Sequence, residues 1–446
     1  MKYKLIVDHY GKIEHAEVVV APLTLFVGDN NSGKSYLLSL IWALNGGAYN
    51  LPLFEGLETL ELPQLDQVWN RIWPVFDGKK ESVQIHSSEL VPILNLMLDR
   101  NKQKIADSIF NFQGTPIGGL CLEPLEDIQM TISVFQRPDS SHGSIAMWGI
   151  YPEQKSASLF VYQENEAAAE NGRLKISVMR TILQWMLKQK RTRTIYLPAA
   201  RTGFVLAKDI INQVSRQTAY DLLPGEEAER VQPFPKPILE FLNSLEKLSS
   251  NAKVDTKREQ LVGWMENHMA QGSIRYTEVG AKEIQYVPEG AEKGIPMRSS
   301  SAVITELAPL LLFLKYERFL GMLCYEEPET CLHPQLQLQM GRLLIRLVNQ
   351  GTAVVATTHS DIILQHVNNM IKAYGYRNDE KFLGEAQIDQ DDCLNIQDVA
   401  VYQFTNQGKT SVVEELKAGK DGFPVPTFSN ALMDILDRTT MIQEYK

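Results

Sequence analysis

The sequence predicts an α/β fold, in which a mixed central sheet has flanking helices and is interrupted by a large, partly helical insertion. Three observations predict it. An apolar strand at residues 23–27 runs through a glycine-containing loop into a helix that starts at Lys34. A second apolar segment, residues 322–327, ends in two carboxylates, and a third, β-rich segment at 352–359 ends in a histidine. Strands that alternate with helices in this way are typical of an α/β domain.

Local periodicity predicts the remaining elements. Residues 2–8 and 14–20 alternate polar and apolar side chains around a turn at Tyr10–Lys12, which predicts two paired strands. Short alternating segments predict further strands at 128–135, 145–151, 158–163 and 194–198, and a hairpin at 273–288. Apolar residues that recur at helical spacing predict helices at 34–44, 89–111, 176–190 and 308–318.

The strands expected to share one sheet lie at both ends of the chain. We therefore expect a discontinuous head built from residues 1–45 and 295–446. Residues 46–294 are expected to complete the sheet and to add an inserted lobe, with a helical insert at about 205–268. Heptad repeats are absent from the sequence, which argues against a long coiled-coil arm.

Composition limits the possible classes of protein. The 446 residues are 44% apolar and 22% charged, which is ordinary for a water-soluble protein. No apolar run approaches the roughly 20 residues that span a bilayer, and the N-terminus lacks the apolar core of a signal peptide. The four cysteines form no C-x-x-C pair, and the net charge of −10 argues against a broadly basic nucleic-acid surface. We expect a cytoplasmic protein without disulfides, a zinc site or a membrane span.

The loop Gly28-x-x-x-x-Gly33-Lys34-Ser35 predicts a phosphate site. Its two glycines permit a tight curl whose N–H groups point at phosphate oxygens, and the following helix adds its positive N-terminal dipole. Lys34 would supply a charge for the β- and γ-phosphates, and the Ser35 hydroxyl would ligate Mg²⁺. The alternative is a plain turn, but strand, loop and helix occur in the required order. The predicted nucleotide-binding residues here are Asn30, Asn31, Ser32, Gly33, Lys34 and Ser35.

Two further strand ends carry polar groups suited to triphosphate chemistry. A buried strand ending in Glu326 and Glu327 places both acids at the carboxyl edge of a parallel sheet, where ligands bind in such folds. One acid can hold Mg²⁺ through water, and the next can polarise the attacking water as a general base. His359 follows another strand and can donate a hydrogen bond to a γ-phosphate, or it is simply a structural histidine.

Taken together, Val27–Ser35, Cys324–Pro334 and Ala356–Ser360 resemble the ATP-binding-cassette (ABC)-type ATPase heads of the SMC/Rad50/RecF lineage. The resemblance is greatest to the AAA15 or OLD-like subgroup. In that subgroup the acidic motif at Glu326–Pro334 commonly has the sequence Glu-Glu-Pro-Glu-x-x-Leu-His-Pro. The resemblance implies an ABC-type P-loop fold with ATP and Mg²⁺ as cofactors. It is specific for residues 1–45 and 295–375, and loose in between.

The same resemblance implies roles for individual residues. Glu326 has the Mg²⁺-binding role together with Ser35, Glu327 is the catalytic base, and His359 is the switch histidine. The loop Glu329–His333 would meet the opposite subunit. These roles are implied by the family pattern and remain to be compared with the geometry of the site.

In this lineage a signature segment contacts the ATP of the partner head, and Arg298–Leu307 occupies the matching position. Its serines Ser299, Ser300 and Ser301 would then be nucleotide-binding, because a helix N-terminus suits phosphate. The segment lacks the glycine of the usual pattern, which puts efficient hydrolysis in doubt. The alternative is a plain serine N-cap with a capping contribution from Glu306.

Other charged residues leave alternatives open. Arg201, in a strand-end segment that resembles one common in AAA15-type ATPases, either neutralises phosphate or holds a loop by a buried salt bridge. The basic run Lys188–Arg193 either complements a helix C-terminal dipole or contacts a nucleic-acid backbone. The acids Asp389–Asp392 and the remaining histidines are predicted to be surface residues.

These observations predict an ATPase that dimerises, or forms a higher homo-oligomer, with ATP between its heads. The resemblance implies a sensor or regulatory subunit for a separate effector protein, a nuclease or toxin, in prokaryotic antiphage defence. We expect no nuclease in this chain, because only about 85 residues follow His359, fewer than a Toprim domain needs, and the acids Asp389–Asp392 do not end an apolar strand. The alternatives are a non-hydrolysing nucleotide-dependent scaffold and a RecF-like repair ATPase that binds DNA directly.

Overall fold

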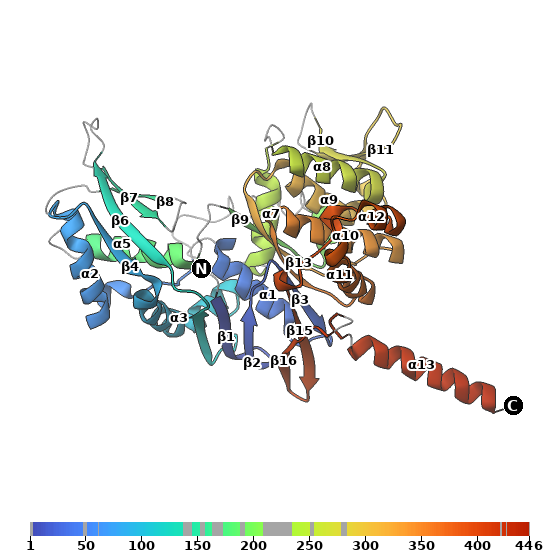
Figure 1. The fold of residues 1–446 in the computed structure, drawn as a ribbon, viewed down its shortest axis with the longest axis horizontal. Helices are drawn as coiled ribbons and strands as arrows, with labels where there is room; N and C mark the ends of the chain where they lie inside the picture. Colours follow the sequence, from blue (N-terminus) through green and yellow to red (C-terminus); the bar gives the residue numbers. More distant parts are fainter. Residues whose placement is uncertain are drawn as a thin grey trace, which may run out of the picture.

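The computed structural model describes residues 3–47, 51–60, 62–136, 145–151, 157–162, 173–187, 192–207, 234–249, 254–277, 283–419, 422–424 and 426–445. A sheet of nine strands, in the order β5-β1-β2-β16-β15-β3-β14-β13-β9, crosses the molecule (Figure 1). The strands are β1 (Tyr3–Tyr10), β2 (Ile13–Val19), β3 (Leu23–Gly28), β5 (Gly119–Pro124), β9 (Arg193–Leu197), β13 (Leu320–Glu326), β14 (Ala353–Thr357), β15 (Val399–Gln407) and β16 (Thr410–Leu416). The predicted α/β fold with a mixed central sheet is confirmed.

The middle of this sheet is parallel. β3 pairs with β15 on one side and with β14 on the other, and β14, β13 and β9 continue in the same direction. The remaining pairs, β1 with β2, β1 with β5, and β15 with β16, are antiparallel, while β16 pairs in parallel with β2. The carboxyl ends of β3, β14, β13 and β9 therefore meet at one edge of the sheet.

Helices cover both faces of the sheet, because side chains alternate along each buried strand. Phe26 and Cys324 belong to the core on one face, while Leu25 and Leu323 belong to the core on the other. The first face packs against α1 (Lys34–Trp42), α3 (Ser87–Phe110) and α5 (Arg173–Leu187). The second packs against α7 (Lys236–Lys247), α8 (Thr256–Met265), α9 (Ala302–Tyr316), α10 (Pro334–Asn349) and α11 (Asp361–Ala373).

Smaller units are attached to this body. A second sheet, β4 (Ser82–His86), β6 (Gln129–Gln136), β7 (Ile145–Tyr151) and β8 (Ala157–Tyr162), forms a lobe with α2 (Pro63–Phe76), at the left in Figure 1. A third sheet joins β10 (Gly272–Tyr276), β11 (Ile284–Pro288) and β12 (Ile295–Pro296). Beyond α12 (Glu380–Ala386), the last helix, α13 (Pro426–Glu444), extends away from the body. Among the described residues, no helix has the length and apolar character needed to cross a bilayer.

Most predicted elements form close to their expected positions, with two departures. The helix predicted from residue 308 begins earlier, at Ala302, because Ser301 caps it. The segment 399–416 adds the antiparallel β15–β16 hairpin to the central sheet, which the strand patterns did not predict. Of the basic run, residues 188–191 lie outside the described residues, as do residues 208–233 of the expected helical insert.

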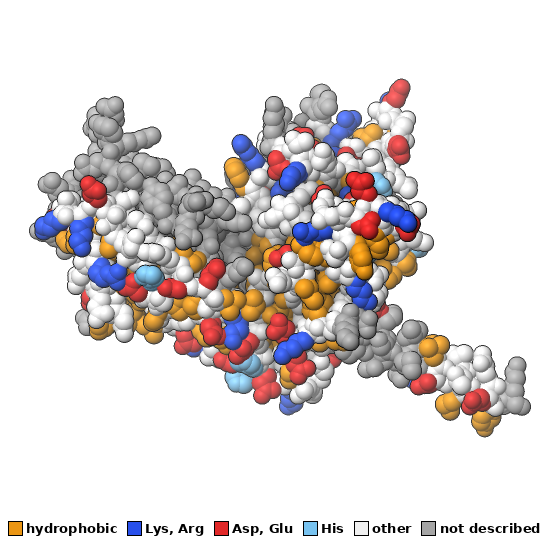
Figure 2. Space-filling view, viewed as in Figure 1, with side chains coloured by type: hydrophobic (Ala, Val, Ile, Leu, Met, Phe, Trp, Pro, Cys, Tyr) orange, Lys and Arg blue, Asp and Glu red, His pale blue; other side chains and the backbone are white. Residues whose placement is uncertain are grey.

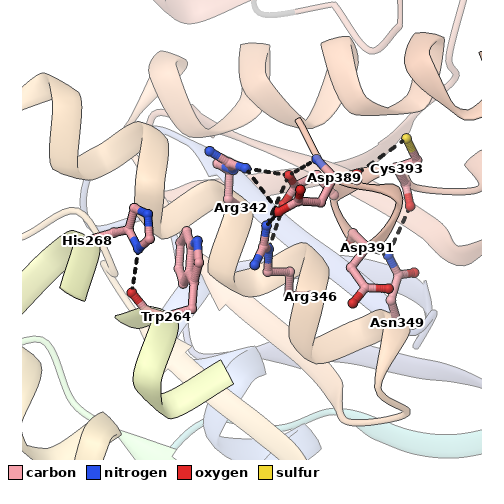
Figure 3. A network of polar contacts seen from close by, with 9 residues as sticks. Trp264, His268, Arg342, Arg346, Asn349, Asp389, Asp391 and Cys393 are labelled. Atoms are coloured by element: carbon pink, nitrogen blue, oxygen red, sulfur yellow. Dashed lines mark hydrogen bonds and ion pairs between the residues drawn. The ribbon is translucent and has the colours of Figure 1, made fainter. Parts of the chain in front are cut away.

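The prediction that the acids at 389–392 lie at the surface is wrong for Asp392. Its carboxylate is fully buried and accepts hydrogen bonds from Arg342 Nη2 at 2.5 Å and Arg346 Nε at 2.7 Å, both from α10. Figure 3 shows the two arginines directed toward the turn that carries Asp389. The Arg346 guanidinium also lies over the Trp264 ring, 4.5 Å from its centre. Although burial opposes it, bonding to these arginines lowers the pKa of Asp392. The cluster fixes the 389–392 turn against α10 and α8.

Candidate functional site

The loop after β3 has the tight backbone that the glycine spacing predicts. Gly28 and Gly33 have φ values of +111° and +96°, in the region where only glycine is free of strain. A Cβ at Gly28 would lie 2.2 Å from the carbonyl oxygen of Phe404 on β15. Both conformation and space therefore require glycine at Gly28. The non-glycine residue Asn31 also has a positive φ, of +54°.

Lys34 lies inside the curl of this loop. Its Nζ donates hydrogen bonds to the carbonyl oxygen of Gly28, at 3.1 Å, and to that of Asp29. The side chain is buried, and this burial lowers the pKa of Lys34 to about 8, against the opposing charges of Glu327 and Asp29. A triphosphate bound in the loop would place negative charge beside this ammonium and so stabilise its charged form, which burial disfavours.

The β15–β16 hairpin supports the loop from outside. The Asn406 backbone N–H donates to the Asp29 carboxylate at 2.8 Å, and the Ser411 hydroxyl donates to the Ser32 carbonyl at 2.7 Å. Ser32 in turn donates through its hydroxyl to the Asp29 carbonyl at 2.7 Å. Sequence reasoning missed these supports, because no local pattern signals a contact between residues so far apart along the chain.

Glu326 stands at the end of β13, opposite Thr357 in the neighbouring strand β14. One carboxylate oxygen accepts a hydrogen bond from the Ala199 backbone N–H at 2.9 Å. Burial and the charge of this carboxylate raise the pKa of Tyr196. Ser35 is the second residue of α1 and has an exposed side chain. A carboxylate and a hydroxyl suit Mg²⁺, which takes only one or two protein ligands when it binds with phosphates.

Glu327 has an unusual backbone. Its φ of +43° lies in the left-handed region, which costs an L-residue roughly 1–2 kcal/mol. The conformation is held because the Glu327 N–H donates to the Thr357 carbonyl at 2.9 Å. The Thr330 hydroxyl donates weakly to the Glu327 carboxylate, at 3.4 Å. Strain of this kind at a sheet edge is typical of a functional position.

Glu329 positions the loop that carries His359. Its carboxylate accepts hydrogen bonds from the Thr358 hydroxyl at 2.9 Å and from the His359 backbone N–H at 2.6 Å. The resemblance implied only that Glu329 belongs to a loop facing the opposite subunit, so its bonds within this chain are a new feature. Partial burial and the charge of Lys34 lower the pKa of His359, which favours the neutral imidazole.

The serines of the signature segment begin α9. The Ser301 hydroxyl caps the helix by accepting from the Ile304 backbone N–H at 3.4 Å, and the side chains of Ser299 and Ser301 are exposed. The Ser300 hydroxyl donates to the Pro296 carbonyl at 3.3 Å. The alternative of a plain serine N-cap is therefore present at Ser301, but its capping contribution from Glu306 is not, because that carboxylate is buried and pairs with Arg201. Contact between these serines and a second subunit's nucleotide stays a prediction.

Arg201 and Glu306 form a fully buried ion pair. This favours the second of the two roles open for Arg201, a buried salt bridge, over contact with phosphate. In the basic run, the Arg193 guanidinium lies 2.6 Å from the Glu317 carboxylate and is therefore already neutralised. Among the described residues, no cluster of acidic, histidine and cysteine side chains could by itself hold a metal ion.

The edge of the sheet thus brings together a phosphate loop, two carboxylates and a histidine. Lys34 and Glu327 each influence the pKa of His359, and Glu327 also influences that of Lys34. These three side chains, from β3–α1, β13 and β14, are therefore electrostatic neighbours. The arrangement can bind a triphosphate, hold a water against it and donate a hydrogen bond to its terminal phosphate.

Residues 154–364 match the family model described as AAA ATPase domain. This stretch contains Glu326, Glu327 and His359, and it leaves out the loop at Gly28–Ser35, which lies earlier in the chain. The match supports an ATPase function and says nothing of what the ATPase controls. No curated protein is significantly similar to the sequence.

Several solved structures are similar to this chain at low identity. An SMC head domain from Thermotoga maritima is 11% identical, with a TM-score of 0.36 over 94% of this chain and 100% of that one. An SMC head bound to the C-terminal winged-helix domain of ScpA is 12% identical, with a TM-score of 0.38 over 94% and 98%. An SMC head with an extended coiled coil, bound to the C-terminal domain of ScpA derived from Pyrococcus furiosus, is 12% identical, with a TM-score of 0.37 over 98% of both chains.

Proposed function

We propose that this chain binds and hydrolyses ATP, dimerises around the nucleotide, and regulates a separate effector protein. The single observation that carries the ATPase part is the meeting of Lys34, Glu327 and His359 at one edge of the sheet. Each comes from a different strand–loop unit, and each has the chemistry that one step of triphosphate hydrolysis needs.

In this proposal the loop N–H groups and Lys34 hold the phosphates, and Glu327 orients and deprotonates the attacking water. The neutral imidazole of His359 donates a hydrogen bond to the γ-phosphate and stabilises the charge that develops there. Ser35 and Glu326 would hold Mg²⁺, which supplies charge neutralisation between the β- and γ-phosphates when bound. Glu329 keeps His359 at the site through its backbone.

The proposed dimer rests on the signature segment. Ser299 and Ser301 are exposed at the N-terminus of α9, where free N–H groups favour an anion. A second subunit would bring these serines to the ATP held by Lys34 of the first. Each loop is then half of a composite site, so ATP binding and association of the heads are coupled.

The proposed regulatory role, with a nuclease or toxin as effector in antiphage defence, rests on the family resemblance. It is supported by α13, which carries large exposed apolar side chains in Figure 2. Ile435, Met441 and Ile442 are each more than half exposed, with values of 61%, 69% and 73%. Exposed apolar residues gathered in this way are characteristic of a protein-binding surface.

Two substitutions test the ATPase proposal. Lys34→Ala should abolish ATP binding, whereas Lys236→Ala, which removes an ammonium bonded to Ser108 away from the site, should leave it intact. Glu327→Gln should bind ATP, retain only residual turnover, and accumulate as an ATP-bound dimer, measured by light scattering. Normal turnover in the Glu327→Gln protein would overturn the proposal. Tight ATP binding without turnover in the unaltered protein would instead indicate a nucleotide-dependent scaffold.

A further inference from the structure

We propose that Arg201 is the positioning residue for Glu327, and that its ion pair with Glu306 fastens this general base to helix α9. The inference rests on the proposed ATPase function and deepens it. It gives the helix that carries the signature serines a direct mechanical connection to the group that activates water.

The first step is the set of hydrogen bonds from Arg201 to the backbone at the end of β13. Its Nη1 donates to the Glu326 carbonyl at 2.8 Å and to the Pro198 carbonyl at 3.0 Å, and its Nη2 donates to the Glu327 carbonyl at 3.0 Å. The guanidinium also lies over the Tyr325 ring, 4.6 Å from its centre. Arg201 therefore binds the carbonyl groups of both residues of the acidic pair.

These bonds act on the strained residue itself. The Glu327 N–H is held by Thr357 on β14, and its carbonyl is held by Arg201. Both peptide groups next to the left-handed Cα are thus fixed, which is what a φ of +43° requires to persist. Without Arg201, the backbone could relax and turn the carboxylate away from the phosphates.

The second step is the connection to α9. Glu306 is 1% exposed, pairs with Arg201, and accepts a hydrogen bond from the Thr202 hydroxyl at 2.5 Å. A buried guanidinium needs a counter-charge, because desolvation without one is costly. Burial raises the pKa of Glu306, and Arg201 opposes that rise. The buried Arg201–Glu306 ion pair therefore links the segment after β9 to helix α9.

The third step is the position of Glu306 along the helix. It lies five residues after the N-cap Ser301, roughly 7–8 Å along a rigid helix. A shift of the α9 N-terminus, as when a second subunit's nucleotide engages the serines, moves Glu306 and through it Arg201. Association of the heads would in this way set the orientation of Glu327.

The test is a double-mutant cycle on turnover. Glu306→Gln preserves the shape of the side chain but removes the charge that holds Arg201. We expect kcat to fall about tenfold or more, with ATP affinity within about twofold of the unaltered protein. In a Glu327→Gln background, where the base is already absent, Glu306→Gln should have no further effect on residual turnover.

Glu317→Gln is the matched control. Glu317, the C-cap of α9, pairs with Arg193 at the start of β9 at 2.6 Å, so this second ion pair lies at the opposite end of β9 from the acidic residues. It should change thermal stability without changing kcat. If Glu306→Gln does not fold, Thr202→Val removes one hydrogen bond to the same carboxylate, together with a weak contact to the Thr305 hydroxyl at 3.4 Å, and should lower kcat by about two- to threefold.

The outcomes separate the inference from the proposed function. Absence of turnover in the unaltered protein would overturn the ATPase proposal. Turnover in the unaltered protein, with the same kcat in folded Glu306→Gln or Thr202→Val, would overturn the inference alone. An equal loss with and without Glu327 would also overturn it, because that is the signature of a merely structural pair.

Discussion

The carboxylate of Glu329 accepts a hydrogen bond from the backbone N–H of His359 at 2.6 Å, and so ties the loop after β13 to the loop after β14. The same carboxylate accepts a bond from the Thr358 hydroxyl. The acidic motif therefore supplies more than the two residues at the strand end. Its fourth residue, Glu329, fixes the position of the loop that carries the His359 imidazole.

Replacing Glu329 with glutamine should impair hydrolysis. The glutamine side chain has one acceptor oxygen, so one of the two donors, Thr358 or His359, would face its NH₂ group. We expect kcat to fall about tenfold, with ATP affinity little changed, because Lys34 and the loop remain in place. Turnover and nucleotide affinity measured on the same preparation test this, and an affinity loss with unchanged kcat would contradict it.

ATP affinity should depend on pH through Lys34. Burial lowers the pKa of Lys34 to about 8 in the free protein, and bound phosphates would raise it again. Above pH 8 the empty site loses its proton, so binding must take one up, and the dissociation constant should rise by about tenfold per pH unit. Titrations from pH 7 to 9.5 measure this slope.

Lys34→Arg is the control for that titration, because a guanidinium keeps its charge throughout this range. Whatever its absolute affinity, this variant should show a much flatter dependence on pH. Equal slopes in the two proteins would place the titrating group elsewhere.

Gly28→Ala should destabilise the protein and abolish ATP binding. The new Cβ would lie 2.2 Å from a backbone oxygen on β15, at a φ of +111°. Gly290→Ala separates the two effects, because Gly290 has a φ of +75° with open space around it. Gly290→Ala should cost roughly 1–2 kcal/mol of unfolding free energy from backbone strain alone. Denaturant unfolding compares the pair, and a smaller loss in Gly28→Ala would refute this account.

His366 should make stability fall in mild acid. It was predicted to lie at the surface, but it is buried against Gly341 on α10, and burial lowers its pKa to about 4, with Asp392 and Arg342 acting in opposite directions. Between pH 6.5 and 4 the unfolded chain binds a proton that the folded chain does not. Stability is therefore full above pH 6.5 and is lost as pH falls towards 4, by up to about 3 kcal/mol.

Thermal unfolding of a His366→Gln variant isolates this contribution. Between pH 7 and 4.5 its melting temperature should fall less steeply than that of the unaltered protein. His268→Gln, at an exposed histidine, serves as the comparison and should follow the unaltered protein. Parallel curves for His366→Gln and the unaltered protein would show that another group is responsible.

The parts of the site that the sequence predicts are those marked by a local motif within one short segment of the chain. Lys34 follows from glycine spacing, and Glu326 and His359 follow from strands that end in polar residues. Parallel strands then bring such ends together whatever lies between them, because their carboxyl ends share one edge. The sheet direction could therefore be predicted without knowledge of the inserted lobe.

The parts that sequence did not predict are contacts between distant segments. Glu306 looked like a capping residue because it follows serines, yet its partner is Arg201, more than a hundred residues earlier. Asp392 looked exposed because its neighbours are polar, and only the arginines of α10 bury it. Pairing of this kind depends on packing between elements, for which a single sequence carries no periodic signal.

The position of β3 between β14 and β15 has a consequence for biosynthesis. The phosphate loop leaves the ribosome early, but Asn406, which bonds Asp29, is 377 residues further along the chain. At a synthesis rate of about 5–20 residues per second, roughly 20–75 s pass between synthesis of the loop and synthesis of Asn406. A nascent chain therefore has a nucleotide loop without the strands that shape it, so ATP can be engaged only once synthesis has passed β15.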